Sequence, residues 1–140
     1  MQDILNNLHP VIAVAPQVVS DDTALVGGII DRQGFDALAF VIATGTLADA
    51  DATFTVLVEH GDQADLSDAA AVPDAELLGT ETLAGFGAAD DDETRKVGYR
   101  GAKRYVRLTI TPAGNTASAP LAAVAILGAP NVAPTANPPQ

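Results

Sequence analysis

Residues 35–43 read Phe-Asp-Ala-Leu-Ala-Phe-Val-Ile-Ala, and this stretch decides the fold class. Its larger side chains, Leu38, Phe40 and Ile42, recur at every second position, which is the period of a β-strand rather than of a helix. The positions between them are apolar as well. We therefore expect a strand with both faces buried.

A second strand is predicted for residues 52–60, in which Phe54, Val56 and Val58 face inward and alternate with mostly polar residues. Only a short connection containing Gly and Asp separates it from residues 35–43. Two β-rich runs joined in this way are typical of a β-hairpin, so we expect the two strands to pair.

Strands dominate the rest of the chain. Residues 104–111 alternate clearly, and residues 121–127 form a small apolar run that suits tight packing between two layers. Weaker strands are predicted at 11–15, 24–30, 82–87 and 95–100. About seven or eight short strands separated by Gly, Pro and Asp loops are typical of a β-sandwich or barrel.

The chain reads as one domain with looser ends. Residues 1–10 lack periodicity and are expected to form a loose N-terminal arm, followed by a β-sandwich domain over residues 11–128. Residues 129–140 contain four prolines, so we expect an extended C-terminal tail. Within the domain, residues 62–72 are expected to be a long surface loop with at most a short helix.

The inward positions of the clearest strands define the expected core. A chain of 140 residues can bury roughly two thirds of its unfolded surface, enough for a core without disulfides, and this chain has no Cys. The expected core residues are Leu38, Phe40, Ile42, Phe54, Val56, Val58, Val106, Leu108, Ile110, Val124 and Ile126.

Charge is distributed unevenly along the chain. The sequence has 18 acidic and seven basic residues, six of the bases lie within residues 95–107, and no acid follows Glu93. Such a chain either folds its basic segment against its own acids or presents complementary patches to copies of itself or to a large partner.

Residues 95–107, which we call the basic stripe, combine Arg and Tyr, the residue types enriched at protein interfaces. One interpretation is a contact surface. The other is a solvated sheet face with ion pairs inside the subunit, each contributing little stability. The candidate interface residues are Arg95, Lys96, Tyr99, Arg100, Lys103, Arg104, Tyr105 and Arg107.

Catalytic and cofactor chemistry has little support. The two histidines, His9 and His60, are widely separated, no Ser lies in a nucleophile elbow, and no glycine-rich phosphate loop opens a helix. We therefore expect no enzymatic activity and no required cofactor. The run Asp90-Asp91-Asp92-Glu93 could bind a cation, solvate a loop or pair with the basic stripe.

Nucleic acid and membranes are also poor candidates as partners. A net charge of -11 repels phosphate, and few aromatic residues are available to stack on bases. The N-terminal segment lacks the basic region of a secretory signal, and the early apolar run is too short to span a bilayer. We expect synthesis in the cytoplasm.

Four segments carry a resemblance to a known family. They are residues 44–54 (Thr-Gly-Thr-Leu-Ala-Asp-Ala-Asp-Ala-Thr-Phe), 77–80 (Leu-Leu-Gly-Thr), 96–107 (Lys-Val-Gly-Tyr-Arg-Gly-Ala-Lys-Arg-Tyr-Val-Arg) and 126–130 (Ile-Leu-Gly-Ala-Pro). Together they resemble small proteins encoded beside the major capsid protein in tailed bacteriophages and prophages, which include jelly-roll cement, or decoration, proteins. The resemblance covers about residues 35–130 and rests on structural motifs.

The resemblance implies an all-β, jelly-roll-like antiparallel β-sandwich with extended terminal arms. It implies a structural virion protein, made in the host bacterial cytoplasm, that binds the capsid exterior and cements neighbouring major capsid subunits. A homo-oligomer is expected, with a dimer favoured. The alternative is a surface β-sandwich that binds carbohydrate or a host receptor, which would need exposed aromatic side chains. A metal-dependent jelly-roll enzyme would need His and carboxylates in one barrel mouth.

Overall fold

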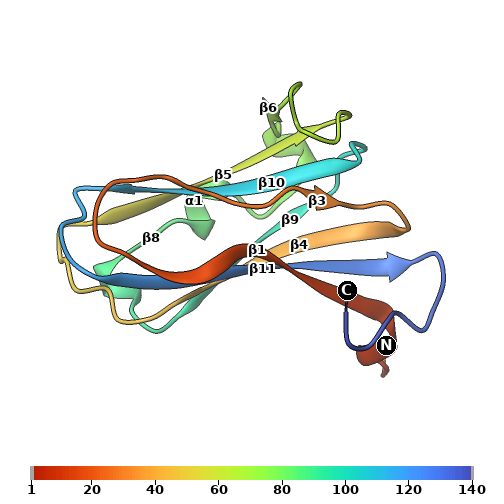
Figure 1. Cartoon of the computed structure of the whole chain (residues 1–140), viewed down its shortest axis with the longest axis horizontal. Coiled ribbons are helices and arrows are strands. Elements are labelled where there is room, and N and C mark those ends of the chain that lie inside the picture. Colours follow the sequence, from red (N-terminus) through yellow and green to blue (C-terminus); the bar gives the residue numbers. More distant parts are fainter. Residues whose placement is uncertain (1, 140) are drawn as a thin grey trace.

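Two sheets, A and B, form the layers of a sandwich in the computed structural model, which describes residues 2–139 (Figure 1). Neighbouring strands in both sheets are antiparallel. In spatial order, sheet A consists of β1 (Leu8–Val19), β11 (Ala119–Pro130), β4 (Phe35–Thr44), β9 (Thr94–Tyr99) and β7 (Leu77–Leu78). Sheet B consists of β2 (Leu25–Val26), β10 (Tyr105–Ala113), β5 (Thr53–Gly61) and β6 (Ala70–Ala71), with β3 (Ile30–Asp31) also paired to β10 and β8 (Phe86–Gly87) to β5.

The chain passes repeatedly from one layer to the other: β1, β4, β7, β9 and β11 lie in sheet A, whereas β2, β3, β5, β6, β8 and β10 lie in sheet B. This is the strand order of a jelly roll, and the predicted all-β antiparallel sandwich is confirmed. The predicted hairpin is wrong, because β4 pairs with β11 and β9 while β5 pairs with β10. The connection crosses between layers, and the Gly45 N–H at its start donates to the Pro120 carbonyl of sheet A at 2.8 Å.

Short helices occupy several connections. The strand predicted at residues 82–87 is wrong for its first half, where α1 (Glu81–Ala84) forms because the Thr80 hydroxyl accepts the Leu83 N–H at 3.0 Å. Residues 62–72 form the expected surface loop, with β6 near its end and no helix among them. The 3-10 helices are η1 (Leu5–Asn7), η2 (Asp74–Glu76) and η3 (Ala88–Asp90).

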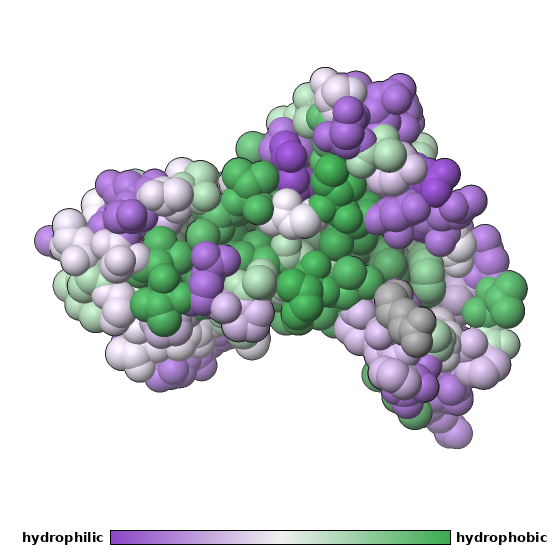
Figure 2. Space-filling view, in the orientation of Figure 1, coloured by the Kyte–Doolittle hydropathy of each residue, from purple (hydrophilic) through white to green (hydrophobic). Residues whose placement is uncertain are grey.

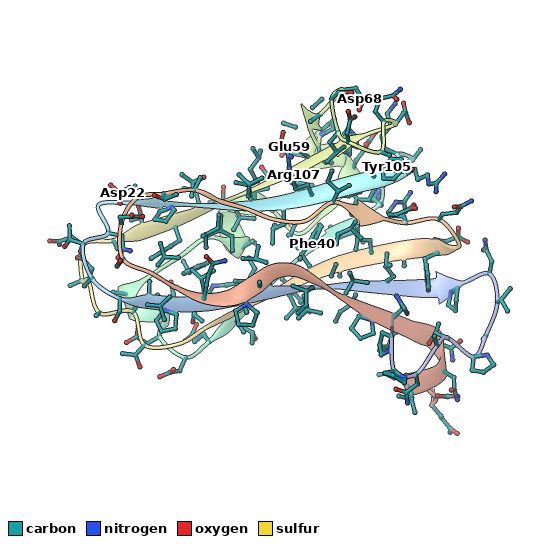
Figure 3. The ribbon with its side chains drawn as sticks, viewed as in Figure 1. Asp22, Phe40, Glu59, Asp68, Tyr105 and Arg107 are labelled. Carbon is teal, nitrogen blue, oxygen red and sulfur yellow. The ribbon has the colours of Figure 1, made fainter. Side chains whose placement is uncertain are left out.

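The core lies between the sheets and contains the predicted inward residues of three strands. Phe40 lies between the two layers (Figure 3) and is fully buried. The alternation in β4, β5 and β10 therefore assigned their inward faces correctly. The confirmed core residues are Leu38, Phe40, Ile42, Phe54, Val56, Val58, Val106, Leu108 and Ile110.

The prediction for β11 is wrong. Val124 and Ile126 are only half-buried and lie on the outer side of sheet A, whereas Ala123 and Ala125 face the core. Every residue of this strand is apolar or Gly, so its alternation carries no information about which face is buried. The expectation that both faces of β4 are buried is also wrong, since no sheet or helix among residues 2–139 forms a layer over the outer face of sheet A.

The two terminal segments lie beside each other (Figure 1). The Thr135 N–H donates to the Asn6 carbonyl at 3.0 Å, and its hydroxyl donates to the Leu8 carbonyl at 2.6 Å. Because β1 begins at Leu8 and β11 ends at Pro130, sheet A includes small parts of the expected arm and tail. Within residues 2–139, no helix is long and apolar enough to cross a membrane.

Candidate contact surface

The outer face of sheet A is a broad apolar surface, which we call the apolar face. It is built from alternate residues of neighbouring strands, as the register of their pairing requires. Its residues are Leu8, Pro10, Ile12 and Val18 of β1, Pro120, Ala122, Val124, Ile126 and Gly128 of β11, Ala37, Ala39, Val41 and Ala43 of β4, Thr94, Lys96 and Gly98 of β9, and Leu78 of β7.

This face differs sharply from the rest of the chain. It contains no acid, although the chain has 18, and Lys96 is its one charged residue. Ile12 is 54% exposed, Val18 62% and Leu78 55%. Strand β11 places Val124 and Ile126 on its outer side together with Ala122, so these apolar side chains stay partly exposed in the free chain. Contiguous exposed apolar surfaces of this kind are typical of sites that contact other molecules.

The apolar face is hollowed as well as apolar. Figure 2 shows a concave lower edge between the terminal segments and the opposite end of the sandwich, with a hydrophobic floor. One hollow of about 460 Å³ is lined by Val18, Ala43 and Pro120 among others. A second, of about 350 Å³, is lined by residues that include Ala39, Leu78 and Lys96. The face can therefore receive protruding side chains of a partner.

The basic stripe is divided between the two layers, because β9 belongs to sheet A and β10 to sheet B. Four of its cations bind acids of the same chain, as the alternative interpretation of the stripe expected. Arg104 donates to both carboxylate oxygens of Asp31, at 2.8 and 2.9 Å. Arg107 donates to Glu59 at 3.2 Å on the outside of sheet B (Figure 3). Folding thus neutralises most of the positive charge of the basic stripe, while the chain keeps its net negative charge.

The remaining pairs involve Arg95 and Lys103. Arg95 binds Asp90 and, at 3.0 Å, Glu93, which confirms that the acidic run supplies partners for the basic stripe. Lys103 binds Asp62 at 2.5 Å, and this hydrogen bond raises the pKa of Lys103.

Two carboxyl groups of these pairs titrate below the ordinary value of 3.8. The pKa of Asp31 is lowered mainly by its hydrogen bond with Arg104, and that of Asp90 mainly by the Gly87 N–H and then by Arg95. A pKa that is lower in the folded than in the unfolded chain adds stability above the unfolded value, and this stability is lost as the pH falls. These contacts therefore stabilise the fold at neutral pH and not in strong acid.

Tyr99 does not belong to the surface. It is 2% exposed, and the prediction that its side chain is an interface residue is wrong. Its position two residues after Val97 places it on the core side of β9, where its hydroxyl lies 2.8 Å from the His60 Nδ1 atom and accepts the Lys103 N–H at 3.0 Å. Burial is the main cause of a raised pKa for Tyr99.

Three other residues of the basic stripe lie in different parts of the structure. Lys96 lies on the apolar face, Arg100 is exposed in the loop after β9, and the half-buried Tyr105 lies under the Arg104 guanidinium, 5.0 Å from the ring centre. A contact role for the surface residues of the stripe stays a prediction. Nothing in the local sequence marked the apolar face itself except the all-apolar run in β11.

The two histidines and the acidic run make contacts with other residues of the same chain. His9 stacks on Phe35 with ring centres 5.5 Å apart, and His60 is buried. Asp91 accepts the Leu47 N–H at 2.7 Å. Over residues 2–139, no group of three or more His, Cys, Asp or Glu side chains could hold a metal ion.

Reversing the charge of Arg107 is expected to destabilise the fold more than reversing Arg104. The Arg107–Glu59 pair is only 22% and 19% exposed, whereas Arg104 and Asp31 are each 45% exposed and better screened by solvent. We expect Arg104→Glu to cost about 1 kcal/mol or less and Arg107→Glu more than that, measured by urea denaturation. Arg104→Gln and Arg107→Gln are the neutral controls. Equal costs at the two positions would contradict this account.

No protein-family model matches the sequence, and no curated protein matches it. Among solved structures, that of infectious bursal disease virus, Gx strain, has a TM-score of 0.50 at 10% identity, with 86% of this chain and 31% of that chain covered. The CBM22-1–GH10 modules of xylanase 10B from Clostridium thermocellum, solved with xylohexaose, have a TM-score of 0.49 at 12% identity, covering 95% and 28%. The SPBc2 prophage-derived protein YomS has a TM-score of 0.49 at 8% identity, covering 89% and 99%.

The chain thus spans about a third or less of the first two structures. At 10% identity, the likeness to the viral protein shows the fold alone. Fold and surface together define the class: over residues 2–139, the protein is an all-β jelly-roll sandwich with a broad exposed apolar face on sheet A.

Proposed function

We propose that this protein is a structural component of a tailed-phage virion. In this proposal it binds the outside of the capsid and cements neighbouring major capsid subunits. The observation that carries the proposal is the apolar face, a broad exposed apolar surface on a chain that is otherwise strongly acidic. The major capsid protein is proposed as the partner because several segments, such as residues 96–107, resemble those of cement proteins.

The size of the apolar face suits such a role. The strands of sheet A contain 12, 12, 10, 6 and 2 residues, and at about 3.3 Å per residue and about 4.8 Å between strands they present on the order of 600 Å², close to the roughly 800 Å² per partner of a standard interface. A subunit that touches several shell subunits at once gains further from high effective concentration. Many modest contacts can therefore hold a shell together.

The two outer faces of the sandwich suggest how it would be oriented. The outer face of sheet B carries exposed Thr53, Thr55 and Thr111 and the Arg107–Glu59 pair, which are suited to water. We therefore propose that sheet A faces the shell and sheet B faces solvent. Synthesis in the host cytoplasm, the absence of nucleic-acid and membrane partners, and a dimer remain parts of the proposal. The intrachain ion pairs weaken the charge argument for self-association.

Carbohydrate binding, the alternative, has less support from the side chains. Within residues 2–139, none of the Phe and Tyr residues is exposed: Phe40, Phe54, Phe86 and Tyr99 are buried, and Phe35 and Tyr105 are half-buried. Sugar rings are usually bound by stacking on exposed aromatic rings. Carbohydrate binding therefore lacks the exposed aromatic rings that it would need, and the experiment below includes a test for it.

Heads assembled from the shell protein alone provide the test. We expect the protein to co-sediment with them at saturating stoichiometry and to raise the temperature at which they break open. Because apolar burial is not screened by ions, binding should persist at high salt. Failure to bind heads at any concentration would overturn the proposal. Binding to an oligosaccharide array instead would favour the alternative.

A further inference from the structure

Lys96 is the one charged residue of the apolar face, and it forms no ion pair with any residue that the structure describes. Its side chain is exposed on β9, directly across from Val41 of β4. Within residues 2–139, no Asp or Glu lies within ion-pair distance of its amine. The other lysine, Lys103, binds Asp62.

A hollow of about 350 Å³ opens next to Lys96. Its lining includes the small residues Ala39, Gly79 and Gly98, with Leu78 as its bulky member. A Cβ atom at Gly98 would lie 2.9 Å from the Leu78 Cβ atom, so only Gly leaves this space open. The hollow is therefore apolar at its floor and has one cation at its rim, which suits a side chain with an apolar stem and a negative end.

Covering the apolar face would bury Lys96 with it. An ammonium group taken out of water without a partner is strongly unfavourable, so the covering surface must supply a negative group or leave Lys96 a path to water. A second copy meeting the same face cannot supply one, because the apolar face contains no acid. Two copies packed face to face would instead bury two unpaired lysines. The partner is therefore a surface of different composition.

We propose that the apolar face docks on the shell protein where an Asp or Glu side chain of that protein enters the hollow beside Lys96 and pairs with its amine. This inference rests on the proposed function and adds the chemistry of the partner surface: apolar, convex and carrying one carboxylate. The acid-free character of the apolar face also disfavours a face-to-face dimer, because neither copy offers a carboxylate to the Lys96 of the other.

Three variants of Lys96 test the proposal by sedimentation with heads made of the shell protein alone. Lys96→Met would leave the shell carboxylate buried and unpaired, so we expect binding to weaken about 30-fold or more. Lys96→Glu should weaken it further, and Lys96→Arg should stay within a few-fold of the unchanged protein. Thr55→Glu, exposed on the outer face of sheet B, is the control for an added charge and should bind normally.

Binding of Lys96→Met that is as tight as that of the unchanged protein, or tighter, would overturn the inference, since the partner would then carry no carboxylate there. Sedimentation velocity of the free protein tests the remaining possibility, which is self-association through the apolar face. If Lys96→Met strengthens self-association, the apolar face belongs to a second copy, and the inference fails. If the unchanged protein does not bind heads, the proposed function fails, independently of the results for the Lys96 variants.

Discussion

Glutamate at Ile12 or at Ala122 is expected to abolish attachment to heads while leaving the fold intact. Both positions lie on the apolar face, Ile12 on β1 and Ala122 on β11, and neither side chain enters the core. A buried carboxylate with no partner opposes association strongly, so we expect affinity to fall at least about 100-fold. Because Ile12 is 54% exposed, Ile12→Glu should cost little stability.

Thr111→Glu is the matched control, since it adds the same charge to an exposed position on the outer face of sheet B. Co-sedimentation with heads measures attachment, and circular dichroism with urea denaturation checks the fold. If the two apolar-face variants bind like Thr111→Glu, the apolar face plays no part in attachment, and the basic stripe becomes the candidate. Loss of binding in all three would point to total charge as the cause.

Phe54→Ala is expected to lower the free energy of unfolding by about 3–5 kcal/mol. Phe54 of β5 stacks on Phe86 of β8, with ring centres 4.8 Å apart and planes 9° from parallel, and both rings are buried. The change removes this contact and leaves a cavity that the surrounding strands cannot close. Since single domains are stable by about 5–15 kcal/mol, the loss is a large share of the total.

Val124→Ala provides the contrast, because Val124 is half-buried on the outer side of β11. We expect it to cost less than about 1 kcal/mol in urea denaturation, far below the cost of Phe54→Ala. A cost comparable to that of Phe54→Ala would show that Val124 packs in the core of the free protein. Its larger effect should appear in attachment to heads, where the lost methyl groups belong to the contact.

Strand positions and inward faces were predictable wherever apolar and polar residues alternate. In β5, Phe54, Val56 and Val58 are separated by polar or exposed residues, and only one orientation buries them. In β11 both faces are apolar and each carries large side chains, Leu121 and Leu127 inward and Val124 and Ile126 outward, so the pattern did not indicate which face is buried. For the same reason, the sequence alone did not predict the apolar face.

The pairing of strands and of charged side chains was harder to predict than the location of the strands along the sequence. The connection between β4 and β5 has the residues of a tight reversal, but in a jelly roll it joins different sheets. Likewise, the basic stripe looked continuous in sequence, yet Arg104 pairs with Asp31 and Arg107 with Glu59 from strands far away along the chain. Tyr99 seemed a surface residue because its neighbours are basic, but the sheet turns it inward.

By itself, the sequence determined the strand class, the Gly and Pro breaks and the segregation of charge, since these depend on local periodicity and composition. The folded chain was needed to show which strands share a sheet, which acids neutralise the basic stripe, and which apolar side chains lie outside the core. These features depend on contacts between residues distant in sequence, which local patterns do not encode. The apolar face and the isolated Lys96 on it exist only because five strands from across the chain align in one sheet.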